Sequence, residues 1–545
     1  MKYLFINGKI YTQSVDRSIE EAVLVEDGLI QKLGTSKDLL DQSSSGAIII
    51  DLEGKIMVPG FNDSHIHLLN YAYGLSKLDL GGAKNIPELI ARGKKVIQNR
   101  KSGEDGWLSG RGLDQNILEE NRIPNRWDLD QISTEVPIVF TRVCEHIVTV
   151  NSKALELCGI NASTSQPEGG HIDQDEEGTP TGVLREAARY LVYERIPPAN
   201  KAAIKSMLAE AAEVLSSYGL TSLQTDDIET FSDKDYEVIF EAYRELIDEG
   251  KLPLRIYKQC LLPSIERLQA FLDKGYNTGV GDGFFKIGPL KLLTDGTLGA
   301  RTAYLNEPYA DEPDNRGINV FTQDQLDELV MTAHQNDMQV LTHAIGDGAM
   351  DMCMDAMEKA QLAYPKDDPR FGIVHLQLTS QRNLERFKEQ NIIAFAEPIC
   401  INSDLYIVED RIGAQRAKTA YNFRSLIDAG VHLTLSTDTP VDLFNPMKSI
   451  YVAVNRKDYN GHPEAGWRMD EALTVEQAVY AYTAESAYAS FEEDVKGSIE
   501  PGKYADLVVL SEDIYQIDPN RIQDVAVEMT MMNGNIVYER SEVVN

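Results

Sequence analysis

Positive charge is scarce in this chain of 545 residues. Lys and Arg total 52 against 86 Asp and Glu, so the formal net charge is −34. A surface of this sign repels nucleic acid and anionic membranes, and we expect neither as a partner. Long apolar runs are also missing, and the apolar run before Asn7 is too short for the core of a signal peptide. The sequence therefore predicts a cytoplasmic protein.

Cysteine is sparse as well, and the scattered spacing and odd number of these residues exclude a disulfide framework and a thiolate zinc site. We expect reduced core thiols at Cys144, Cys158, Cys260, Cys353 and Cys400. The phosphate-binding patterns G-x-G-x-x-G and G-x-x-x-x-G-K-[ST] follow no strand candidate, which argues against a nucleotide-binding protein. The composition, 43% hydrophobic and 25% charged, is that of a globular protein with room for more than one domain.

Both ends of the chain have the pattern of short strands joined by hairpins. The dipeptides Asp27-Gly28 and Asn533-Gly534 lie between apolar runs, and this dipeptide type favours a tight hairpin turn. Chain ends commonly lie near each other in a domain. We therefore expect residues 1–57 and 497–545 to form one small composite β domain.

Between residues 58 and 496 the pattern changes to strands that alternate with helices. One helix candidate opens with Thr322 and Gln325 in a capping box and continues with apolar residues at helical spacing. The apolar runs that separate the helices are MVPGFNDSHIHLL, GLTSLQTDD, PLRIYKQCLL, FFKIGPLKLLTDG, MQVLTHAIG, FGIVHLQL, NIIAFAEP and VHLTLSTDTP. Eight such strands predict the α/β class and a (β/α)₈ TIM barrel, whose chemistry lies at the C-terminal ends of the strands.

One segment does not follow the rhythm of the barrel. Residues 77–186, between the first and second strand candidates, are rich in Gly, Pro, Asn and Asp. We expect an inserted lobe here. A long insertion after a barrel strand lies on the active-site face, so this lobe is a natural source of substrate contacts.

Four of the nine histidines fall at the ends of strand candidates. His65 and His67 are two residues apart, so an extended strand directs both side chains to the same face. His343 and His375 each end an apolar run on the fifth and sixth strands. An isolated H-x-H also occurs in surface loops, and a single histidine after a strand is commonly a hydrogen-bonded core residue. Four at the same end of one barrel favour a metal site.

Two further groups belong to the same end of the barrel. Asp438 follows the eighth strand, where a carboxylate can cap a turn. Beside a metal ion it can instead take a proton from bound water, whose pKa such an ion lowers to about 7. Lys291 lies on the fourth strand and, from the residues alone, is a substrate-charge partner or a side chain that reaches toward solvent.

With these residues in this order, the sequence resembles the amidohydrolase superfamily. More specifically it is similar to the YtcJ-like branch, amidohydrolase family 3, which includes N-substituted formamide deformylases. The resemblance covers nearly the whole chain. Its seven motifs are VPGFNDSHIHL, WLSGRGLD, EHIVTVNSKAL, PEGGHIDQDEEGTPTGVLRE, KLLTDGTLGARTA, STDTPV and GSIEPGKYADLVVL.

The resemblance implies a divalent metal, with zinc expected, and one or two ions. It implies that Lys291 takes the bridging position, which CO₂ carboxylates in relatives with two metals, and that Lys291 and Asp438 are the catalytic residues. It also implies a β-sandwich built from both termini, an inserted lobe and a homodimer. The implied metal ligands are His65, His67, Lys291, His343, His375 and Asp438.

Two positions depart from the family pattern. Glu397-Pro398 stands where the family commonly has Gln before Pro, and Thr437 precedes Asp438 where the family has Ser. The second difference is conservative. The first adds a carboxylate near the site, which would favour a cationic or hydrogen-bond-donating group on the substrate.

The predicted function is that of a metal-dependent hydrolase of a small-molecule amide, with N-formyl and N-acyl amides as candidates. Hydroxide activated by the metal attacks the carbonyl carbon, and Asp438 carries the proton to the leaving nitrogen. His146, Asp295 and Arg301 are the expected substrate contacts, although each could instead be structural. A cyclic-amide or ester hydrolase with the same site is an alternative. A regulatory protein on a retired barrel is another, but it predicts lost ligands and none is lost.

Overall fold

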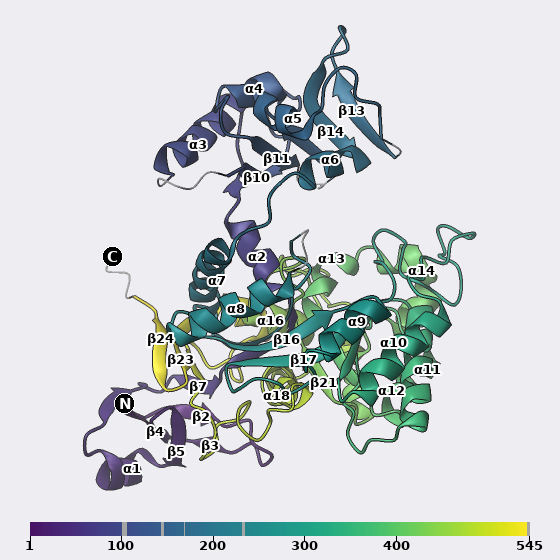
Figure 1. Ribbon diagram of the computed structural model, residues 1–545. Coiled ribbons are helices and arrows are strands. Elements are labelled where there is room, and N and C mark those ends of the chain that lie inside the picture. Colours follow the sequence, from purple (N-terminus) through teal and green to yellow (C-terminus); the bar gives the residue numbers. More distant parts are fainter. Residues whose placement is uncertain (101–105, 143–145, 168, 232–234, 542–545) are drawn as a thin grey trace. The chain divides into compact units, whose positions relative to one another are not determined.

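The computed structural model describes residues 1–545 except 101–105, 143–145, 168, 232–234 and 542–545 (Figure 1). Two compact units divide the chain. The first comprises Met1–Leu68, Leu208–Ile228 and Ile239–Asn545, and the second comprises Leu69–Met207 and Glu229–Val238. In the ranges that are described, every helix is too short or too polar to cross a membrane.

Eight parallel strands form the centre of the first unit and pair in chain order. Each of the eight predicted runs supplies one strand, so the predicted α/β barrel is confirmed. The first and last strands also meet, because Ser64 Oγ donates to the Leu435 carbonyl at 2.9 Å and the Asp438 N–H donates to the His65 carbonyl at 2.9 Å. The strands are β8 (Phe61–Ile66), β15 (Leu220–Asp226), β16 (Arg255–Leu261), β17 (Phe285–Leu293), β18 (Val340–Ala344), β19 (Gly372–His375), β20 (Ile393–Ala396) and β21 (Leu433–Leu435).

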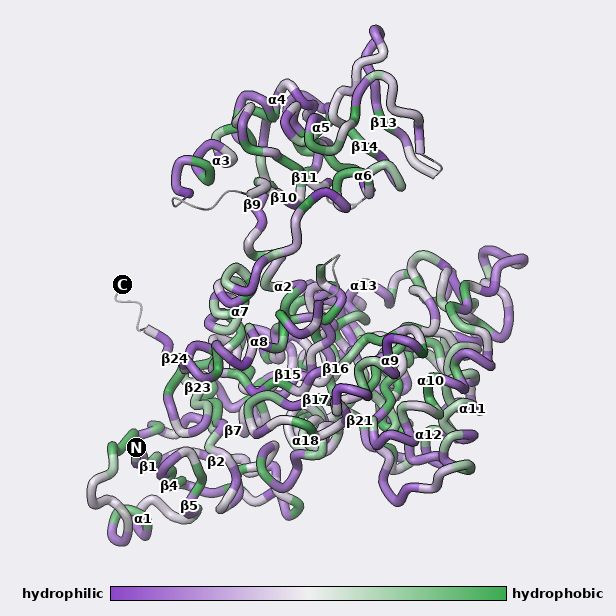
Figure 2. Tube along the Cα trace, in the orientation of Figure 1, coloured by the Kyte–Doolittle hydropathy of each residue, from purple (hydrophilic) through white to green (hydrophobic). Residues whose placement is uncertain are grey.

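Helices follow the strands in the sequence. The predicted capping box is present in α10 (Gln323–Gln335), where the Thr322 side chain accepts from the Gln325 N–H. This helix buries Leu326, Leu329, Val330 and Ala333, and the alternation of hydrophobic and hydrophilic residues along it can be followed in Figure 2. The other helices that lie wholly or partly in the first unit include α7 (Lys201–Ser216), α8 (Tyr236–Asp248), α9 (Ile265–Leu272), α11 (Asp347–Ala363), α12 (Gln381–Glu389), α13 (Ile401–Asp404), α14 (Val408–Arg416), α15 (Phe423–Asp428), α16 (Pro446–Asn455), α17 (Val475–Ala481) and α18 (Ala484–Ala489).

Two smaller sheets contain the ends of the chain. One has the order β5-β4-β1-β6, and the other has the order β24-β23-β22-β7-β2-β3, so strands from both termini pair within one sheet. Phe5 and Val23 of the first sheet share a core with Met57, Val509 and Met529 of the second. The strands are β1 (Lys2–Ile6), β2 (Lys9–Tyr11), β3 (Ile19–Glu20), β4 (Ala22–Glu26), β5 (Leu29–Gly34), β6 (Ile48–Asp51), β7 (Ile56–Pro59), β22 (Leu507–Leu510), β23 (Val527–Met532) and β24 (Asn535–Glu539).

Both predicted hairpins of this region are present. Asp27-Gly28 joins β4 to β5, and Asn533-Gly534 joins β23 to β24. All four residues have positive φ, between 49° and 84°, as the favoured two-residue hairpin turns require. The division into compact units groups these sheets with the barrel, whereas the sequence analysis treats them as a separate domain.

The second unit contains a six-stranded sheet of order β13-β14-β12-β11-β10-β9. Alternation along β11 places Ile138 and Phe140 in one core cluster and Val139 in another, so each face of the sheet has its own core. The unit extends beyond the predicted lobe of residues 77–186. Its elements are α2 (Leu68–Leu75), β9 (Leu78–Asp79), α3 (Ile86–Asn99), β10 (Leu108–Leu113), α4 (Arg126–Asp130), β11 (Ile138–Arg142), β12 (Ile147–Val150), α5 (Ser152–Cys158), β13 (Gly170–Gln174), β14 (Pro180–Glu186) and α6 (Tyr190–Tyr193).

Three of the four described cysteines are buried free thiols, as the sequence predicts: Cys260, Cys353 and Cys400. Cys158 is also free but is only half-buried, so its predicted place in the core is wrong. Cys144 lies outside the described residues.

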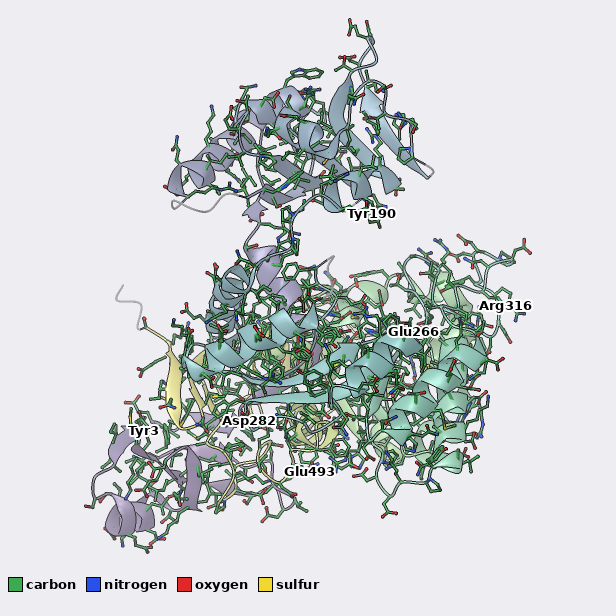
Figure 3. All side chains as sticks on the ribbon, viewed as in Figure 1. Tyr3, Tyr190, Glu266, Asp282, Arg316 and Glu493 are labelled. Carbon is green, nitrogen blue, oxygen red and sulfur yellow. The ribbon has the colours of Figure 1, made fainter. Side chains whose placement is uncertain are left out.

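Two ion pairs, one buried and one partly buried, connect the barrel to the C-terminal segment of the chain. Arg255, at the start of β16, is 2% exposed and donates to both oxygens of Asp506, at 2.6 and 3.1 Å. Asp506 also accepts from the Asn533 N–H at 2.8 Å, at the tip of the last hairpin. A second pair joins Arg370 to Glu493, which is labelled in Figure 3, at 2.6 Å. These pairs fix the start of barrel strands to segments that follow the barrel.

Replacement of Asp506 by Asn should destabilise the protein by about 3–5 kcal/mol, because the guanidinium of Arg255 stays buried without a counter-charge. The shift of the urea unfolding midpoint measures this loss. Glu512→Gln is the matched control, since its partner Arg521 is 57% exposed and such surface pairs contribute about 0–1 kcal/mol. Equal shifts in the two variants would contradict the role of Arg255 and Asp506.

A second buried network makes stability depend on pH. Glu492 contacts Lys496 at 2.6 Å and Lys286 at 3.0 Å, and Lys496 also donates to Ser222 Oγ at 2.6 Å. Burial alone would raise the pKa of Glu492, but the two lysines outweigh it and hold the pKa at about 2, below the ordinary 4.5. The stabilisation is therefore complete above about pH 4.5 and is lost as the pH falls toward 2.

The Glu492→Gln variant should accordingly be less stable than the wild type at about pH 6, and this difference should shrink by roughly 2 kcal/mol at about pH 3. Denaturant unfolding of both proteins at the two pH values measures the change. A difference that stays constant with pH would show that Glu492 has the same pKa in the folded and unfolded chain.

Candidate metal centre

The four histidines and Asp438 come together at the C-terminal end of the barrel strands. His67 Nε2 lies 3.0 Å from Asp438 Oδ1, and His65 Nε2 lies 3.4 Å from the same oxygen. The ligand atoms of His65, His67 and Asp438 lie within 4.8 Å of one another, close enough to hold one metal ion. Lys291 Nζ lies 3.1 Å from His65 Nε2. The ring centroids of His343 and His375 are 4.3 Å apart.

Hydrogen bonds on the far side of the rings fix the orientation of the H-x-H pair. Gln259 donates through Nε2 to the Ser64 carbonyl at 2.9 Å, so its Oε1 faces His65 Nδ1 at 2.6 Å and accepts from it. His67 Nδ1 donates to the Asp226 carbonyl. In the neutral form of each ring the lone pair is therefore on Nε2, the atom that faces Asp438. Such outer partners set the tautomer and the direction of metal-binding histidines.

The other two histidines are oriented by carboxylates. His343 Nε2 lies 3.2 Å from Asp295 Oδ1 and 3.3 Å from the Gly296 carbonyl, an arrangement that leaves the lone pair on Nδ1. His375 Nδ1 lies 2.5 Å from Glu397 Oε2. His375 has φ of 78° and Asp438 has φ of 56°, unusual values for residues other than glycine, and such strain gathers at functional sites.

Burial sets the protonation of the centre. It lowers the pKa of His65 and His343 and brings that of His375 to about 4, so all three rings are neutral, as metal ligands must be. Burial would raise the pKa of Asp438, but the hydrogen bond with His67 outweighs burial and holds the pKa below its usual range. The same contact raises the pKa of His67, although burial alone would lower it. Asp438 is therefore a carboxylate at neutral pH. Burial also lowers the pKa of the Lys291 amine.

The three predicted substrate contacts have different surroundings. Asp295 is buried and accepts from the backbone N–H groups of Tyr304, Ile345 and Gly346 at 2.8–3.0 Å, besides its contact with His343. Its observed contacts orient His343 and the loop after β18. Arg301 forms an ion pair with Asp311 at 2.7 Å.

His146 belongs to the second unit, where its Nδ1 lies 2.7 Å from Glu186 Oε2 at the surface. Asp295 and Arg301 belong to the first unit. That His146, Asp295 and Arg301 bind a substrate stays a prediction.

Sequence analysis places Glu397 near the site but not among the metal ligands. It interprets this residue as a departure from the family pattern that affects substrate polarity, whereas the structure groups Glu397 with His65 and His375, with ligand atoms within 4.8 Å of one another. The signal that could have found it is the one that found the histidines, a polar residue directly after a barrel strand. Gln259 was missed as well, because nothing in the local sequence tells that it faces His65.

Imidazole nitrogens and carboxylate oxygens are the ligands of Zn²⁺ and similar divalent ions, so the donor set fits such an ion. A sequence model of the amidohydrolase family matches residues 49–538, nearly the whole chain. The chain belongs to the amidohydrolase family. As a member of that family it is a hydrolase.

Individual relatives place this amidohydrolase in the YtcJ-like branch. The Bacillus subtilis (strain 168) protein YtcJ, named as an amidohydrolase, is 32% identical over 99% of this chain and 100% of its own length. N-substituted formamide deformylase of Arthrobacter pascens is 27% identical over 99% of this chain and 98% of its own length. A solved structure of an uncharacterized metal-dependent hydrolase from Pyrococcus furiosus is 31% identical, with a TM-score of 0.78 over 95% of this chain and 100% of that chain.

The Gln259→Leu variant of this amidohydrolase should bind zinc about 10–100-fold more weakly, because His65 loses the acceptor that fixes its tautomer. Competition with a chromogenic chelator measures the dissociation constant. Gln224→Leu is the matched control, since Gln224 is equally buried on the neighbouring strand β15 but donates to the Ser486 carbonyl. If both variants lose zinc equally, affinity follows general stability and Gln259 has no special role.

Proposed function

We propose that this amidohydrolase hydrolyses an amide C–N bond of a small molecule, with N-formyl and N-acyl amides as the substrate class. The observation that carries the proposal is the group formed by His65, His67 and Asp438, in which Nε2 of both imidazoles faces a buried carboxylate. Its similarity to N-substituted formamide deformylase along the whole chain supports the choice of substrate class.

The proposed cofactor is one or two divalent ions, with zinc as the expected metal. His65, His67 and Asp438 would hold one ion, and His343, His375 and Lys291 would contribute to a second. The Lys291 side chain is fully buried and its pKa is lowered, which favours the neutral amine that reacts with CO₂. We therefore propose that Lys291 can be carboxylated and would then supply a carboxylate ligand.

A divalent ion bound here acidifies a water molecule and polarises the amide carbonyl. Asp438 accepts the proton of that water as its oxygen bonds to the carbonyl carbon, and then gives the proton to the nitrogen as the C–N bond breaks. The products are a carboxylic acid, formic acid for an N-formyl substrate, and an amine. His65 and His67, held by Gln259 and the Asp226 carbonyl, keep the reacting groups in place.

The Asp438→Asn variant should keep most of its metal while turnover falls about 10²–10⁴-fold, because an amide does not accept the proton of the attacking water. A His65→Ala/His67→Ala variant should lose metal as well as activity. Elemental mass spectrometry gives the metal content, and a panel of N-formyl amides, N-acyl amides, lactams and esters gives the turnover. Asp513→Asn, at a carboxylate paired with Lys9, is the control.

Several results would decide between the proposal and its alternatives. Unchanged turnover in Asp438→Asn would refute the proton-transfer role. A preference for lactams or esters would show a cyclic-amide or ester hydrolase on the same site. A protein that binds no divalent ion after reconstitution would refute the hydrolytic mechanism and favour a regulatory protein.

A further inference from the structure

Glu397 is the most unusual charged group at the C-terminal end of the barrel. It follows β20 directly, and its side chain is 1% exposed. One oxygen, Oε2, lies 2.5 Å from His375 Nδ1. The other oxygen, Oε1, is buried and has no hydrogen-bond partner among the described residues. The described part of the protein thus supplies a hydrogen-bond partner for one oxygen of this carboxylate and not for the other.

A buried carboxylate oxygen without a partner costs free energy, which either a proton or a bound cation removes. Burial and the neighbouring carboxylate of Asp438 raise the pKa of Glu397 well above its usual range. The thiol of Cys400, whose Sγ lies 3.7 Å from Oε2, is only a weak donor. A cation bound at Oε1 would take the place of the proton and stabilise the carboxylate form of Glu397.

The ligand atoms of Glu397, His65 and His375 lie within 4.8 Å of one another, as those of His65, His67 and Asp438 do. His65 belongs to both groups, but its only available lone pair is on Nε2, because Nδ1 donates to Gln259. One lone pair binds one ion. An ion held by His65, His67 and Asp438 thus leaves Glu397 and His375 as ligands for another.

We propose that Glu397 is a metal ligand through Oε1 and that it holds, together with His375, a second divalent ion of the centre. The inference rests on the proposed function, since it concerns the same metal site. It assigns to the chain a carboxylate ligand on the seventh strand, in addition to Asp438 on the eighth. A second ion bound in this way has an anionic ligand that belongs to the protein itself, whether or not Lys291 is carboxylated.

The Glu397→Gln variant tests whether Glu397 binds the metal ion or only accepts a hydrogen bond from His375. The Gln carbonyl can still accept from His375 Nδ1, so an orienting role survives. Its amide nitrogen then stands at the position of Oε1, where it cannot bind a cation. Chelated protein is titrated with Co²⁺ or Zn²⁺ by calorimetry, and the bound metal is counted by elemental mass spectrometry. We expect two equivalents in the wild type, and in Glu397→Gln an unchanged first site and a second site weakened at least about 10-fold.

Glu471→Gln is the matched control. Glu471 is a buried carboxylate that accepts from the Ser425 N–H at 2.9 Å, and no described contact joins it to the histidines. It should lower the melting temperature without changing metal binding. If Glu397→Gln does not fold, a crystal structure of the zinc-loaded wild type gives the answer, since a ligand oxygen must lie about 2.0–2.2 Å from the metal.

Failure of this inference differs from failure of the proposed function. If the wild type binds no divalent ion, the proposed function fails. If the wild type binds metal and Glu397→Gln binds it with the same stoichiometry and affinity, only the assignment of Glu397 fails. A variant that keeps both ions but shows a raised KM would also overturn the assignment, and would make Glu397 a contact of the substrate.

Discussion

The meeting of the first and last barrel strands is the constraint on which the centre depends. Asp63 on β8 accepts from the Thr437 hydroxyl at 2.6 Å and from the Thr437 N–H at 3.2 Å, directly before Asp438. Its neighbour Ser64 bonds to β21, and the Asp438 N–H bonds to the His65 carbonyl. These bonds place Asp438 beside both members of the H-x-H pair. Without them the histidines and the carboxylate would be ends of separate strands.

Buried charge has two different uses in this protein. In the network of Arg255 and Asp506, and in that of Glu492 with two lysines, each charged group has a counter-charge and hydrogen bonds, so the network stabilises the fold. At the C-terminal ends of the strands the groups are left incomplete. The acidic side chains of Asp438 and Glu397 lie among the imidazoles, and Oε1 of Glu397 has no hydrogen-bond partner among the described residues. A complete network needs no ligand, whereas an incomplete one gains free energy when it binds a cation.

The fold could be predicted from the sequence because its signals are local. Each barrel strand is a short apolar run between helical patterns, and Asn533-Gly534 marks its hairpin without reference to the rest of the chain. The candidate centre followed from one rule, that polar residues after parallel strands meet. The same rule applies to Glu397, but its difference from the family pattern led to an interpretation in terms of substrate polarity. Ring orientation could not be predicted, because it depends on Gln259, which is 194 residues from His65.

The pairing of β8 with β21 also determines when the centre can exist during synthesis. Ser64 and Leu435 are 371 residues apart, so the H-x-H pair leaves the ribosome long before the strand that completes the barrel. Contacts of such large sequence separation form slowly, and incomplete chains expose apolar strands in the meantime. The nascent chain therefore exposes His65 and His67 before Asp438 is available. The group of His65, His67 and Asp438 forms only after the last strand has reached its place.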